Sequence, residues 1–336
     1  MSIGKLRFHF TPSIAIPGRM PLVVVWLVLL LAPALISAQT QVFMDDFNRN
    51  QNPLGATGGT PTMTWTKTGT GLASTAQVSG SNYQLTIDNG STIGRTFLTG
   101  SLSTFATQFN TTLSENKDDV IWTFNIRTAR TSASAGFNNN QYAFAAVLAA
   151  TSADLLNANG YAVTLMKGTA YNAVRLVKFS GGLDADVNLT TIVGPSFESN
   201  NYQHYFSVKV VYTPLTNTWK LYARNDLANA SVDPESGELT QIGAATVDAT
   251  YTNQVLSHCG FFINHGSNTT PASNKVNFDN FKVVVDNRLF TPAADITWST
   301  PNWGQGTLTP GSNYDVRIPS NRKVTNTGTA ASKMLH

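Results

Sequence analysis

Two acidic stretches, far apart in the chain, carry the side chains best suited to binding a metal ion. Asp45 and Asp46 lie in VFMDDFNR near the start, and Asp279 and Asn280 lie in VNFDNFKVVVD much later. Calcium prefers about six to eight oxygen ligands from carboxylates, amides and backbone carbonyls. If the two stretches are neighbouring strands, these four side chains meet and predict a Ca²⁺ site. Otherwise each acidic side chain faces solvent or caps a turn.

A pair of carboxylates could also cleave glycosidic bonds, one acting as the acid and the other as nucleophile or base. The chain has only four glutamates, Glu115, Glu198, Glu235 and Glu238. None lies in a Glu-x-Asp-x-x-Glu or similar run, so we expect solvated loop charges there and assign no catalytic residue. An aspartate pair is the alternative, but no spacing supports one. The internal histidines, His204, His258 and His265, lack the spacing of zinc ligands.

The first 38 residues have the order of regions expected of a secretory signal peptide. A basic segment is followed by the apolar run PLVVVWLVLLL and by small residues that end at Ala38. We expect cleavage between Ala38 and Gln39. An uncleaved membrane anchor is the alternative, but the apolar run is short for a span of roughly 20 residues. The sequence therefore predicts a secreted or cell-surface protein with no stable membrane span after cleavage.

The charge of the mature chain is close to zero. The whole sequence has 22 basic and 19 acidic residues, and removing the leader's Lys5, Arg7 and Arg19 leaves 19 of each. Such a chain has no electrostatic footprint for nucleic acid or an anionic membrane. Cys259 is the only cysteine, so no internal disulfide can form. We expect a buried, inert thiol there and a core large enough to stabilise an exported bacterial protein without disulfides.

Short segments of alternating apolar and polar residues recur between the two acidic stretches. In VIWTFNI, residues 120–126, four apolar side chains face one way. The wholly apolar residues 142–150 predict a buried strand rather than the start of a helix. A hairpin is expected across residues 161–179, and a second across residues 205–222 through the turn TPLTNT. The turn signal Asp88-Asn89-Gly90 suggests a third, joining residues 83–87 to 95–98.

About ten to twelve such strands, with no convincing amphipathic helix, predict an all-β antiparallel sandwich. Its first and last strands would be the two acidic stretches, and the domain would span residues 39–288. Residues 289–295 read as a linker. Residues 296–336 have a different composition and are too short for a core of their own.

The run VKVVYTPLTNTWKLYAR, residues 208–224, resembles the central hairpin of laminin-G-like and concanavalin A-like jelly-roll domains. DDFNR and FDNFKV resemble the ends of such domains in secreted Bacteroidetes-type surface proteins. The resemblance covers about residues 40–288. Residues 296–336 are similar to the start of a β-rich repeat of the same surface proteins, with Thr297-Trp298, Trp303 and the motif DVRIP. That similarity suggests a second β-rich module that is truncated here.

The resemblance implies a jelly-roll fold, a structural calcium where the two ends of the domain meet, and sugar binding through exposed aromatic rings. Trp65, Tyr202 and Tyr251 lie in or near expected loops and are the candidate ligand-binding residues. Trp122 and Trp219 lie on alternating strands, which predicts core positions for them.

The leading hypothesis is a non-catalytic binding or adhesion module that recognises polysaccharide or cell-surface glycan. The alternatives are a glycoside hydrolase-like enzyme and a structural spacer of a larger surface protein. A close, exposed carboxylate pair in a groove would favour the enzyme. An aromatic-lined groove without such a pair would favour binding, and a surface with neither would favour the spacer.

Overall fold

The computed structural model describes most of the predicted sandwich. The described residues are 39–49, 57–69, 75–78, 85–88, 93–128, 136–165, 167, 174–196, 203–228, 231–266 and 275–286, with four short strands beyond them. These are two parallel pairs, β18 (Leu289–Phe290) with β20 (Asp315–Val316) and β19 (Ile296–Thr297) with β21 (Val324–Thr325). The predicted linker therefore begins with a strand. The predicted signal peptide and most of the second module lie outside the described residues.

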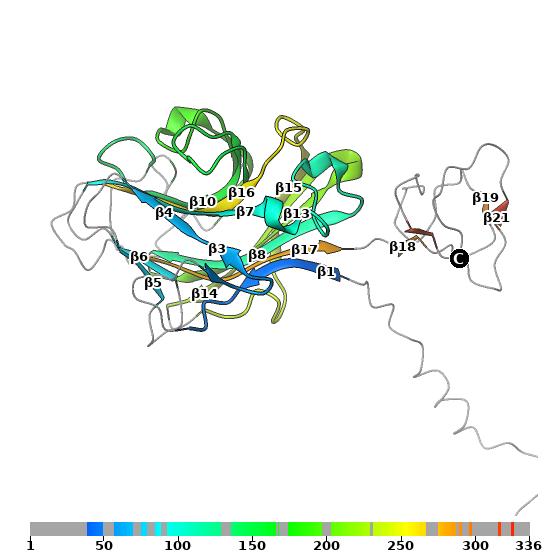
Figure 1. Ribbon diagram of the computed structural model, residues 1–336, viewed down its shortest axis with the longest axis horizontal. Helices are drawn as coiled ribbons and strands as arrows, with labels where there is room; N and C mark the ends of the chain where they lie inside the picture. Colours follow the sequence, from blue (N-terminus) through cyan, green and yellow to red (C-terminus); the bar gives the residue numbers. More distant parts are fainter. Residues whose placement is uncertain are drawn as a thin grey trace, which may run out of the picture. The chain divides into compact units, whose positions relative to one another are not determined.

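The fold is an all-β sandwich of two antiparallel sheets, as the sequence predicts (Figure 1). In the described chain, the eight strands of the larger sheet are, in order, β15 (Thr240–Val247), β14 (Thr218–Leu227), β13 (Tyr205–Thr213), β8 (Asp119–Thr128), β17 (Lys275–Asp286), β6 (Leu85–Asp88) and β5 (Thr75–Val78), with β1 (Gln39–Asp45) beside β17. The second sheet is β12 (Leu189–Ser196), β11 (Val174–Phe179), β10 (Gly160–Leu165), β9 (Ala143–Ala150), β16 (His258–His265), β7 (Gly94–Ser101) and β4 (Thr66–Gly69).

Short elements connect these strands. A two-stranded ribbon pairs β2 (Thr57–Gly58) with β3 (Met63–Thr64). The 3-10 helices of the described residues are η1 (Leu102–Phe105), η2 (Leu113–Glu115), η3 (Asp186–Asn188) and η4 (Pro214–Thr216). None of the helices in this part of the chain is long and apolar enough to cross a membrane.

Hydrophobic pattern accounts for the strands that the sequence predicts best. Strand β9 is buried along its whole length, because it lies between β10 and β16 and its sheet packs on the other one. The hairpin of β13 and β14 turns at η4, where Pro214 begins the turn and Asn217 adopts a left-handed φ of 50°. The side chains of Trp122 and Trp219 are fully buried and stack 6.0 Å apart, so both predicted core positions are confirmed.

The first and last strands of the sandwich are neighbours, as expected. Strand β1 runs antiparallel to β17 and places Asp45 opposite Phe281. The register of β17 shifts between Asp279 and Lys282 against β8, and Asn280 has a positive φ of 51° at this bulge. A bulge turns successive side chains away from strict alternation.

The hairpin expected after residue 88 does not form. Strand β6 pairs with β5 and β17, whereas β7 pairs with β4 and β16 in the other sheet. A turn signal reports only that the chain changes direction, because the residues of a turn do not determine which sheet the next strand joins.

One aromatic residue lies at the centre of the core between the two sheets. The ring centroid of Phe261, on β16, is 4.4 Å from that of Phe278 and 5.2 Å from that of Phe281, both on β17. Trp65 lies 5.5 Å away and Phe47 lies 6.1 Å away. Phe261 thus connects the two sheets through ring contacts that exclude water.

Replacing this ring should destabilise the fold strongly. For Phe261→Ala we expect the free energy of unfolding to fall by about 3–5 kcal/mol, because a large cavity opens in a core that can relax only in part. Denaturant unfolding monitored by tryptophan fluorescence measures this loss. Val187→Ala, at a side chain that is 89% exposed, is the control and should change stability by less than about 0.5 kcal/mol. A loss for Phe261→Ala no larger than the control's would contradict the central role of this ring.

Candidate functional site

Asp45 is a structural carboxylate. It is fully buried and pairs through both oxygens with the Arg49 guanidinium, whose Nη2 lies 2.8 Å from Oδ2. Trp65 Nε1 donates to Oδ2 at 2.9 Å, and the backbone amide of Phe47 donates to Oδ1 at 2.9 Å. Because four donors already satisfy the two oxygens, this carboxylate has little capacity left for a cation.

The structure corrects the placement of Trp65. Its side chain is 4% exposed and packs between Phe43 and Phe261 in the core, so the ring offers no face to a sugar. Tyr251 is half-buried, and its ring meets that of Tyr161 edge-on at 5.9 Å. Tyr202 lies outside the described residues. Trp65 and Tyr251, the two that the structure describes, therefore do not form an aromatic platform.

The other predicted calcium ligands lie near the bulge of β17. Asp46 accepts hydrogen bonds from the amide and side chain of Asn48, at 3.1 and 3.0 Å. Asp279 accepts from Ser231 Oγ at 2.8 Å, and the Asn280 side chain donates to Asn125. No group of three His, Cys, Asp or Glu side chains suited to a metal ion occurs among the described residues. The calcium site stays a prediction, with Asp46, Asp279 and Asn280 as its remaining ligands.

The Asp279 carboxyl holds its proton unusually well. Its pKa is raised from 3.8 to about 7, mainly by burial and in smaller part by the nearby carboxylates of Asp46 and Asp45, while hydrogen bonds from Ser231 and the Asn280 amide lower it. The pKa is raised because a buried charge loses the solvation that water provides.

A groove on the outer face of the larger sheet is the best candidate for a ligand site. It encloses about 520 Å³, within the range of about 300–1,000 Å³ that is usual for ligand pockets. Its floor is formed by side chains of five strands, Gln39, Ile121, Thr123, Lys209, Tyr222 and Val284. One wall is a loop, which we call the strap, residues 231–239; its groove-lining residues are Pro234, Glu235, Gly237, Glu238 and Leu239.

The floor has an apolar strip with one aromatic ring. Ile121, Val211 and Val284 form a small cluster apart from the main core, and Tyr222 packs against it. Burial and the nearby Asp119 carboxylate raise the pKa of the Tyr222 phenol. The Lys209 ammonium lies 5.7 Å from the centre of the Tyr222 ring, which is a cation–π distance.

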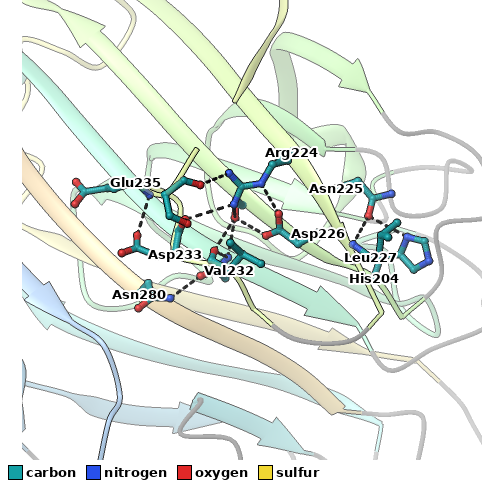
Figure 2. Close-up of polar contacts among 12 residues, drawn as sticks. His204, Arg224, Asn225, Asp226, Leu227, Val232, Asp233, Glu235 and Asn280 are labelled. Carbon is teal, nitrogen blue, oxygen red and sulfur yellow. Dashed lines mark hydrogen bonds and ion pairs between the residues drawn. The ribbon is translucent and has the colours of Figure 1, made fainter. Parts of the chain in front are cut away.

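Polar contacts hold the strap onto the sheet. The carbonyl of Val232 accepts from Asn125 Nδ2 at 2.9 Å. Arg224 reaches from β14 to the carbonyls of Ser236 and Asp233, at 2.6 and 3.4 Å (Figure 2). These contacts cover Asn125 on the outer face of β8, whose inner face belongs to the core.

Ionic contacts strengthen this attachment. Arg224 Nε lies 2.5 Å from Asp226 Oδ1, and the Asp226 side chain is only 1% exposed. Ser207 Oγ donates to the other oxygen of Asp226 at 2.5 Å. Lys282, on β17, contacts both oxygens of Glu235 at 2.8 Å. The strap is therefore a fixed wall of the groove.

The groove was missed by sequence reasoning. The run WKLYAR indicated a strand and its hairpin, and Glu235 and Glu238 were placed correctly in a solvated turn. Alternation along β14 puts Tyr222 on the face opposite Leu221. That signal marked an outward-facing ring, but not the strap that makes a groove beside it.

The Asp279 pKa predicts a pH-dependent stability. The folded protein binds this proton more tightly than the unfolded chain, so the free energy of unfolding falls as pH rises from 3.8 to about 7. Asp279→Asn cannot ionise and should remove this part of the slope, making the variant more stable relative to wild type at pH 8 than at pH 4. Denaturant unfolding across this pH range measures the difference. Parallel profiles for the two proteins would show that the carboxyl is not protonated near neutral pH.

The strap contacts predict a strongly coupled pair at Arg224 and Asp226. Arg224→Met leaves the Asp226 charge buried without its cation and should cost about 3–5 kcal/mol of unfolding free energy. Adding Asp226→Asn removes that charge and should recover part of the loss. A double-mutant cycle by denaturant unfolding checks the coupling, and additive losses would show that the two side chains do not depend on each other.

Comparisons with known proteins give likenesses of structure alone. No protein-family model and no curated protein sequence matches the chain. Among solved structures, it resembles a peanut lectin with a 9mer peptide, at 12% identity and a TM-score of 0.41, covering 74% of this chain and 97% of that chain. It also resembles basic winged bean lectin with Tn-antigen, at 9% identity and a TM-score of 0.42, covering 74% of this chain and 98% of that chain. A third likeness is to the catalytic domain of a glycoside hydrolase family 131 protein from Coprinopsis cinerea. The identity is 13% and the TM-score 0.36, and the match covers 60% of this chain and 69% of that chain.

Proposed function

We propose that this chain is an exported glycan-binding module and that the groove beneath the strap is its binding site. The observation that carries the proposal is the floor of the groove, where the Tyr222 ring and an apolar strip lie among hydroxyl, ammonium and carboxylate groups. A binding role fits an exported protein of near-zero net charge better than recognition of nucleic acid does.

Sugar rings have the same mixed character as this groove. One face of a pyranose is made of C–H groups, which pack against apolar and aromatic surfaces, while its edge carries hydroxyls that donate and accept hydrogen bonds. The partly exposed Tyr222 ring supplies the apolar face, and the nearly buried Ile121 and Val284 pack beneath it. Lys209, which is partly exposed at the floor, and Glu238, which is exposed at the wall, supply polar groups. Such a combination of apolar surface and a few polar groups is typical of ligand sites.

Lys209 has two roles in this proposal. Without ligand, its ammonium lies over the Tyr222 ring and covers apolar surface that would otherwise contact water. Its four-carbon stem is flexible, so the ammonium can move aside when a sugar packs on the ring and can then donate to a hydroxyl.

Hydrolysis is the second candidate, because Glu235 and Glu238 both line the groove. A glycoside hydrolase needs its two carboxylates on either side of the scissile bond. Here both glutamates belong to the same wall, and Glu235 is already paired with Lys282. This arrangement favours binding over catalysis.

The wider setting of the module is part of the proposal. An exported chain that continues into a second β-rich segment suits a bacterial surface protein, in which the sandwich presents the groove to glycans outside the cell. A structural calcium at Asp46, Asp279 and Asn280 would brace the bulge of β17 beside the strap. Its loss should lower the melting temperature without removing a groove residue.

A glycan-array assay on the exported chain, with calcium and with a chelator, tests this function. We expect binding to one glycan class, reduced about tenfold or more by Tyr222→Ala and largely retained by Tyr222→Phe, because the ring rather than the hydroxyl makes the contact. Tyr251→Ala is the matched control at a tyrosine outside the groove and should bind as wild type does. Turnover of the bound glycan would establish the enzyme instead. Absence of binding in both conditions would leave the structural spacer as the better account.

A further inference from the structure

We infer that the groove takes an extended stretch of glycan, about four sugar rings long, rather than a single sugar. This inference rests on the proposed glycan-binding function and specifies its ligand. It follows from how the floor residues are distributed over the strands of the sheet.

The floor crosses five neighbouring strands. Tyr222 lies on β14, Lys209 on β13, Thr123 and Ile121 on β8, Val284 on β17 and Gln39 on β1, and these strands are consecutive in the sheet. Four intervals of about 4.8 Å separate the first strand from the last, so the floor extends about 19 Å across the sheet. A single sugar would occupy about one of these intervals.

The register makes the path diagonal. Tyr222, Lys209 and Thr123 lie directly opposite one another in one row. Ile121 and Val284 form the next row, and Gln39 lies opposite Asp286, one row further. Each row is two residues along the strands, so the path also advances about 14 Å along them and is roughly 23 Å long.

The groove is narrow along this path. Every strand contributes one floor residue, except β8, where the path passes from one row to the next. The strap limits one side. The row of floor residues is therefore about 7 Å wide, which suits one sugar ring.

The far end of the path leads off the sheet. Among the described strands β1 pairs with β17, and its other edge makes an isolated bridge from Met44 to Thr60. No further described strand continues the floor beyond Gln39, whose side chain is exposed. A bound glycan can therefore extend beyond the groove at the Gln39 end, whether its reducing or its non-reducing end points that way. An extended glycan also advances by about one strand spacing per ring, so successive rings would meet successive strands.

Isothermal titration with cello-, laminari- and chito-oligosaccharides, from monosaccharides to heptasaccharides, tests the inference on the wild-type protein. For the ladder that binds, affinity should rise steeply up to about four sugars and then become constant. Constant affinity from the monosaccharide onward would overturn the inference while leaving glycan binding intact. If the glycan array shows binding but none of the ladders binds, the inference is overturned and the proposed function stands; absence of binding in both assays overturns both.

Substitutions at the two ends of the path give the sharper test. Tyr222→Ala and Gln39→Ala should each weaken binding of the pentasaccharide about tenfold. A disaccharide cannot reach both ends, so at most one of the two substitutions should weaken its binding. Gln41→Ala, on the same strand but outside the groove lining, is the control. If Gln39→Ala leaves pentasaccharide affinity unchanged, or if both substitutions weaken the disaccharide, the extended path is wrong.

Discussion

The sandwich depends on the pairing of its first and last strands. Strand β17 bonds to β1, β6 and β8, so it joins the earliest and latest parts of the domain in the middle of one sheet. The buried Asp45 carboxylate at the end of β1 is matched by Arg49 and Trp65. A buried charge is tolerated only with such complete pairing, and here the pairing also fixes Trp65 against the core rings that span the two sheets. No disulfide takes part in this closure.

On the outer face of the larger sheet, buried polar groups likewise need partners. Asn125, Ser207 and Asp226 would be solvated on an open sheet, but the strap covers them, and each finds a partner beneath it. The polar network therefore determines where the strap lies. The strap in turn converts a flat, half-apolar face into a groove. The site and the stability of this face thus depend on the same few hydrogen bonds.

The residues of the candidate site were the least predictable from the sequence. The meeting of Asp46, Asp279 and Asn280 near one bulge follows from the expected pairing of the two ends. The Thr-, Pro- and Gly-rich neighbours of Trp65 predict a position in or near a loop, whereas its indole N–H donates to a buried carboxylate 20 residues earlier in the chain. Tyr222 was seen only as a strand residue, since nothing within its own segment indicates that a loop ten residues later will make a wall beside it.

The sequence by itself determined the all-β class, the best strands and hairpins, the buried tryptophans and the inert thiol of Cys259. These features follow from side-chain alternation and turn chemistry, which act over a few residues. Only the tertiary structure decided that β6 and β7 enter different sheets, that Trp65 belongs to the core and that five strands and the strap form one groove. Those outcomes depend on contacts between residues far apart in sequence, which the local pattern of apolar, polar and turn residues does not specify.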